Sequence, residues 1–75
     1  MPNLNEHTEN LHKAKRFLIE ERRILARKMA AGPIAVGLHA SELVALQAAI
    51  DAIDRALKDE ARTAQDVVDD SYGAF

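Results

Sequence analysis

Leucines recur at intervals of seven residues in the first third of the chain, at Leu4, Leu11, Leu18 and Leu25. Because an α-helix turns by about 100° per residue, this interval returns each leucine to the same side of the helix after two turns. Phe17 and Ile24 form a second apolar ridge beside the leucines, so the apolar stripe is wider than the seam of a strict coiled coil. The pattern predicts an amphipathic helix over about residues 5–31.

A break follows this helix. Gly32 suits the position after a helix end, and Pro33 lacks the N–H that would continue the ladder of backbone hydrogen bonds. Ser41 has the side chain of an N-cap, and Glu42 would lie in a first turn, where the helix dipole favours a carboxylate. Apolar residues then recur in steps of three and four, at Leu43, Leu46, Ile50, Ile53 and Leu57. The sequence predicts a loop over residues 32–40 and a second helix over about residues 41–68.

These elements predict an all-α fold. Two helices of similar length joined by a short loop pack as an antiparallel hairpin, which would occupy residues 4–68 and leave residues 69–75 as a flexible acidic tail. A chain of 75 residues buries only a small fraction of its surface, and without cysteine it has no disulfides to stabilise it. Assembly with further copies is the remaining support, so we expect a homo-oligomer, a dimer or larger, with a four-helix bundle as its smallest unit.

One side of the second expected helix is made almost wholly of alanine. It lies between the leucine and isoleucine seam and the charged side, and its residues are Ala45, Ala48, Ala49, Ala52 and Ala56. Alanine raises helix propensity at any position, but small side chains also allow another helix to approach closely. The second interpretation makes the alanines, together with Phe17 and Ile24, the interface of the oligomer.

Catalytic and metal motifs are weak. Glu9 and His12 share a helix face at a spacing seen in metal-binding bundles, but such sites need further inward carboxylates on other helices. Ser41 is expected to cap a helix and Ser71 lies in the tail, so no serine is placed as a nucleophile beside a base. We therefore expect no enzymatic activity, no cofactor and no metal.

Charge is unevenly distributed along the chain. Residues 13–28 hold seven bases and two acids, whereas residues 41–70 hold eight acids and three bases. Arg16, Arg23 and Arg27 lie close together on the polar side of the first helix, with Lys13 near them. This basic stripe could hold phosphate groups, or it could pair with acids of the second helix. DNA is an improbable partner because the whole chain is acidic, with a pI near 5.8.

The N-terminal segment has acids, amides and a histidine where a signal peptide would need a positive region and an apolar run. No run of about 18 uncharged apolar residues is present. These features predict a cytoplasmic protein without a membrane-spanning segment.

A pattern of apolar and polar residues extends over both expected helices. Its positions are Leu4, Glu6, Leu11, Leu18, Leu25, Lys28, Ala31 and Pro33, and then Leu46, Gln47, Ile50, Ala52, Arg55 and Ala56. In these positions the chain resembles the helical hairpin of phage proteins that sequester the cyclic oligonucleotide signals of bacterial CBASS and Thoeris immunity. The stacking tyrosine of that family falls at Met1, and its tryptophan has no counterpart here.

The resemblance implies that a cyclic oligonucleotide is captured between subunits without chemical change. Lys15 and Arg16 of one subunit and Arg55 of another would then hold its phosphates. An alternative is an adaptor or regulator that binds a host protein or RNA through one helical face.

Overall fold

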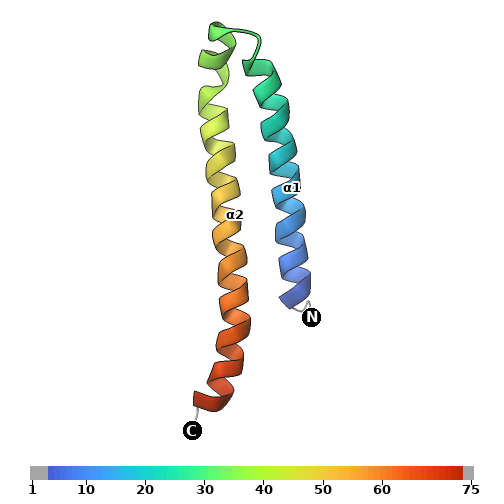
Figure 1. The fold of residues 1–75 in the computed structure, drawn as a ribbon, viewed down its shortest axis with the longest axis vertical. Coiled ribbons are helices and arrows are strands. Elements are labelled where there is room, and N and C mark those ends of the chain that lie inside the picture. The colour runs from blue at the N-terminus through green and yellow to red at the C-terminus, as the bar shows by residue number, and fades with distance from the viewer. Residues whose placement is uncertain (1–3, 74–75) are drawn as a thin grey trace.

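The computed structural model describes the backbone of residues 4–73 and the side chains of residues 6–63. It contains two helices, α1 (Leu4–Met29) and α2 (Pro33–Gly73), which lie side by side in opposite directions (Figure 1). The molecule is a rod with extents of 62 × 20 × 14 Å. The predicted all-α hairpin is therefore confirmed.

The core of the hairpin lies along the predicted seam. Leu25 of α1 and Ile50 of α2 are buried, with 4% and 3% of their surface exposed. The other seam residues within the described side chains are half-buried, namely Leu11, Leu18, Leu43, Leu46, Ile53 and Leu57. A two-helix rod covers only one side of each helix, which explains why so few side chains between residues 6 and 63 are fully enclosed.

The loop predicted over residues 32–40 is wrong, because α2 begins at Pro33. The connection between the helices consists of Ala30, Ala31 and Gly32, with the Ala31 and Gly32 N–H groups donating to carbonyls three residues earlier. Gly32 has a φ of 153°, a conformation that side chains disfavour. Its carbonyl accepts a 3.1 Å hydrogen bond from the N–H of Val36, so Gly32 is the N-cap residue of α2.

The physical reason for this error is the dual role of proline. Pro33 stops a helix that approaches it from the N-terminal side, but it is favoured at the first position of a new helix, where its missing N–H would have no intrahelical partner. The prediction that Ser41 is an N-cap is also wrong. Because α2 already begins at Pro33, Ser41 is an interior residue of the helix, and its side chain is exposed to solvent.

The C-terminal prediction also needs correction. Helix α2 continues to Gly73, so residues 69–73 belong to it and are not a separate tail. This segment has no proline, so every residue in it can donate a backbone hydrogen bond that continues the helix. The predicted flexibility of residues 74 and 75 lies outside the described residues.

Two polar contacts define the register of the helices. Lys15 pairs with Asp54 and Arg22 with Gln47, so a step of seven residues along α1 matches a step of seven in the opposite direction along α2. Extending this register to the end of α1 places Met29 level with Ala40. Residues 33–39 therefore project beyond α1, by roughly 10 Å at a rise of about 1.5 Å per residue. Figure 1 shows the beginning of α2 above the end of α1.

One segment of α2, Pro33–Thr63, is long and apolar enough by length and composition to cross a membrane, with a mean hydropathy of 1.4 in an 18-residue window. The sequence-based exclusion of such a segment required an uninterrupted uncharged run, whereas Glu42 is the single charged residue between Pro33 and Ile50. Helices of soluble proteins pass the same test, so this property alone does not assign the chain to a membrane.

Candidate functional site

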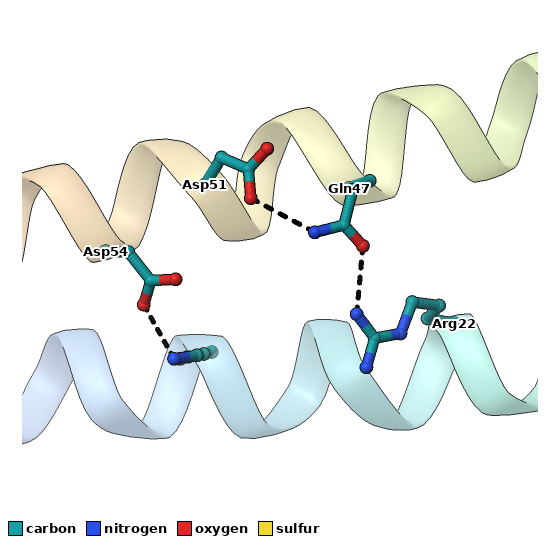
Figure 2. A network of polar contacts seen from close by, with 5 residues as sticks. Arg22, Gln47, Asp51 and Asp54 are labelled. Carbon is teal, nitrogen blue, oxygen red and sulfur yellow. Dashed lines mark hydrogen bonds and ion pairs between the residues drawn. The ribbon is translucent and has the colours of Figure 1, made fainter.

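A row of polar contacts joins the helices along one edge of their interface (Figure 2). The Arg22 guanidinium donates to Oε1 of Gln47 at 2.9 Å, and the Gln47 amide donates to Oδ1 of Asp51 at 3.0 Å. Two turns away, Nζ of Lys15 lies 2.6 Å from Oδ1 of Asp54. These contacts favour one register of the hairpin, because the paired side chains must lie at the same position along α1 and α2.

Lys15 belongs to this row. The family resemblance predicts that it binds the phosphates of a ligand, but its ammonium group is paired with the carboxylate of Asp54 on α2. The pair is partly exposed, with 31% of the Lys15 side chain and 42% of the Asp54 side chain accessible. Lys15 therefore pairs with an acid of the second helix, which is the alternative that the sequence offered for the neighbouring basic stripe.

Arg16 lies elsewhere, on the exposed side of α1. Together with Glu9, His12 and Lys13 it lines a shallow depression of about 340 Å³. Among the described side chains Arg16 makes no ion pair. The depression combines cationic groups with one carboxylate and is open to solvent, so it could contribute one wall of an anion site.

Arg55 is exposed on α2. It belongs neither to the row of polar contacts nor to the residues that line the depression with Arg16. Its neighbour Asp54 faces α1, and a further step of about 100° around the helix turns Arg55 away from α1. One hairpin therefore does not bring Lys15, Arg16 and Arg55 together. A ligand held by Arg16 and Arg55 would need them from different subunits, as the family resemblance implies.

The rest of the basic stripe is also solvent-facing. Nη1 of Arg23 lies 3.8 Å from Oε2 of Glu20, one turn away on α1, and both side chains are largely exposed. Arg27 and Lys28 occupy the last turn of α1, where positive charge is favoured by the helix dipole. A contact of this kind on one exposed helix contributes little to stability, which leaves the stripe available to a ligand.

The residues predicted as an oligomer interface are largely uncovered in the hairpin. Phe17 is 73% exposed, and Ala45, Ala48 and Ala52 are exposed. Ile24, Ala49 and Ala56 are half-buried. Ala45 and Ala49 also line a depression of about 340 Å³ with Leu46, Glu21 and Glu42, which places Glu21 on the same side of the hairpin as the alanines.

Sequence reasoning missed two large members of this surface. Ile34 and Leu38 are 81% and 70% exposed, and with Pro33 and Ala35 they line an apolar depression at the helix connection. The sequence signal was present as an uncharged run between Met29 and Glu42, but assigning this run to a loop concealed its helical periodicity. Val44, also 68% exposed, points to another side of α2.

The described residues contain no group of three or more histidine, cysteine, aspartate or glutamate side chains arranged to hold a metal ion. Within the same part of the chain, Nδ1 of His39 lies 3.9 Å from Oε1 of Glu42 and has no hydrogen-bond partner. The assignments of no metal and no catalysis remain predictions from the sequence.

Comparison of the chain with protein-family models, with curated proteins and with solved structures found no match. The resemblance to the phage sequestering proteins therefore remains a prediction that depends on the residues quoted for it.

Proposed function

We propose that this chain is a non-enzymatic binding protein that works as a homo-oligomer of helical hairpins in the cytoplasm. The main support for this proposal is that only Leu25 and Ile50 are buried among the described side chains, whereas several large apolar side chains of α1 and α2 are exposed. Ile34 and Leu38 are neighbours that line one depression, and contiguous exposed apolar surface is typical of protein interfaces. A second hairpin would cover it and add the core that a single hairpin lacks.

We further propose that the oligomer sequesters an anionic ligand, with a cyclic nucleotide immune signal of the kind bound by the phage family as the first candidate. Two features support this proposal. Arg16 is exposed beside His12 and Lys13 without a described ion pair, and Arg55 is exposed on the other helix. Guanidinium groups from two subunits could bind phosphate oxygens in a bidentate manner. Lys15 would contribute only after giving up Asp54.

Isothermal titration calorimetry with a panel of cyclic di- and trinucleotides tests the ligand. We expect binding of at least one member with a Kd of about a micromolar or tighter, and recovery of the unaltered nucleotide after heating. Arg16→Ala and Arg55→Ala should each weaken binding at least tenfold. Lys58→Ala, which removes a positive charge from an exposed position of α2 outside the basic stripe, is the control. Absence of binding across the panel would exclude cyclic nucleotide capture.

An adaptor that binds a protein or RNA through one helical face is the second candidate. Val44 favours it, because this exposed side chain lies about 80–140° around α2 from Ala45, Ala49, Ala52 and Ala56, so a dimer formed through these four alanines would leave it uncovered. A protein that forms an oligomer but binds no nucleotide of the panel would favour this candidate.

A further inference from the structure

Six apolar residues of α2 lie on one continuous side of the helix, together with one serine. At about 100° per residue they fall within an arc of about 80°. We call this surface the α2 stripe, and its residues are Ile34, Leu38, Ser41, Ala45, Ala49, Ala52 and Ala56. Asp59 lies on the same side one turn further on and ends the apolar surface. The sequence did not predict this stripe, because the predicted loop over residues 32–40 includes its first two residues.

The side chains of the α2 stripe differ in size between its two ends. Its first two members, Ile34 and Leu38, are large and strongly exposed, whereas its second half consists only of alanine. Two such stripes packed in parallel would place large residues against large ones at one end and alanine against alanine at the other. The helices would then be forced apart at one end, because the distance between packed helices follows the side chains at the contact, within about 8–10 Å.

An antiparallel arrangement removes this mismatch. Ala45 is the midpoint of the stripe, so full overlap places it against the partner's Ala45, with Leu38 opposite the partner's Ala52 and Ile34 opposite the partner's Ala56. Each large side chain then meets a small one, which gives an even separation and dense packing. The contact would extend over about 33 Å of helix at a rise of about 1.5 Å per residue.

Charge favours the same arrangement. Glu21 lies on the stripe's side of the hairpin, and Lys28, seven residues later, lies on the same side of α1. The register of the hairpin puts Glu21 level with Ala48 and Lys28 level with Ser41. In the antiparallel dimer these two heights differ by one residue, about 1.5 Å, so Glu21 lies beside the partner's Lys28 as well as level with the partner's Glu42. A parallel dimer would instead bring Glu21 level with the partner's Glu21, and Asp59 with the partner's Asp59.

From size and charge together we propose that the α2 stripe binds a second copy of this chain in antiparallel orientation, with the two-fold axis at Ala45. This inference rests on the proposed homo-oligomer and specifies its interface and direction. Of the predicted interface residues the stripe keeps Ala45, Ala49, Ala52 and Ala56 and leaves out Phe17, Ile24 and Ala48. It adds the projecting turns of α2, with Ile34 and Leu38 as its large side chains.

Disulfide cross-linking tests this orientation, because the chain has no cysteine of its own. Under mild oxidation, full-length Ala45→Cys should form a covalent dimer, and Leu38→Cys alone should not. A mixture of Leu38→Cys and Ala52→Cys should form a mixed dimer. Val44→Cys is the control, because Val44 is about as exposed as Leu38 but lies off the stripe. This variant should stay monomeric on a denaturing gel.

The outcomes separate the two proposals. Rapid cross-linking of Leu38→Cys with itself would overturn the antiparallel orientation while leaving the homo-oligomer intact. Cross-linking of Val44→Cys in place of Ala45→Cys would place the interface on another side of α2. A monomeric mass for the unmodified protein would overturn both the homo-oligomer and the interface.

Discussion

Replacing Gly37 by alanine tests the helical assignment of residues 33–40. Gly37 lies inside α2, and a methyl group added to it would have no neighbour within 4 Å. The substitution therefore introduces no clash and restricts the unfolded chain, which should raise the free energy of unfolding by about 0.5–1 kcal/mol. For a protein of this length that gain corresponds to a rise in Tm of roughly 2–8 °C.

The measurement is thermal and urea unfolding followed by circular dichroism, with all variants at the same protein concentration because an oligomer's stability depends on it. Gly32→Ala is the matched control. Its added methyl group also has no neighbour within 4 Å, but its φ of 153° disfavours a side chain, so this variant should lose about 1 kcal/mol or more. If Gly37→Ala is neutral or destabilising, the first turns of α2 are not helical and the stripe is shortened.

Two further predictions concern the hairpin interface. Ile50→Ala should lower the free energy of unfolding by about 2–5 kcal/mol because the side chain is buried, whereas exposed Val44→Ala should change it by less than about 0.5 kcal/mol; equal losses in urea unfolding would contradict the assigned core. A double-mutant cycle with Lys15→Ala and Asp54→Ala should give a coupling of only about 0.2–1 kcal/mol that declines with added salt, because the pair is partly exposed. A coupling unaffected by salt would show that the pair is shielded, as by a partner subunit.

The sequence predicted the hairpin because the seam has a strong signal. The leucines of α1 and the leucine and isoleucine positions of α2 repeat at helical spacing, and burial of Leu25 and Ile50 follows from that pattern. The start of α2 was not predictable by the same rule. Gly32 and Pro33 are compatible both with the end of one helix and with the start of the next, and Ser41 offered a competing N-cap.

The candidate site was predicted only in part. The sequence identified Arg16 and Arg55 as exposed bases on α1 and α2, but it could not distinguish the neighbouring Lys15, whose pairing with Asp54 depends on the height of one helix against the other. A shift of one residue along α1 turns a side chain by about 100°, which separates the inward Lys15 from the outward Arg16. The exposed surface of Ile34 and Leu38 required the corrected start of α2.

The molar mass in solution tests the central claim, that this hairpin works as a homo-oligomer through the alanine side of α2. Sedimentation equilibrium of the unmodified chain should give at least about twice the monomer mass of 8.3 kDa. Ala52→Glu should give the monomer mass with helicity largely retained, whereas Ala40→Glu, the same change at an exposed position on another side of α2, should leave the oligomer intact. A monomer mass for the unmodified chain, or an oligomer that tolerates Ala52→Glu, would contradict the claim.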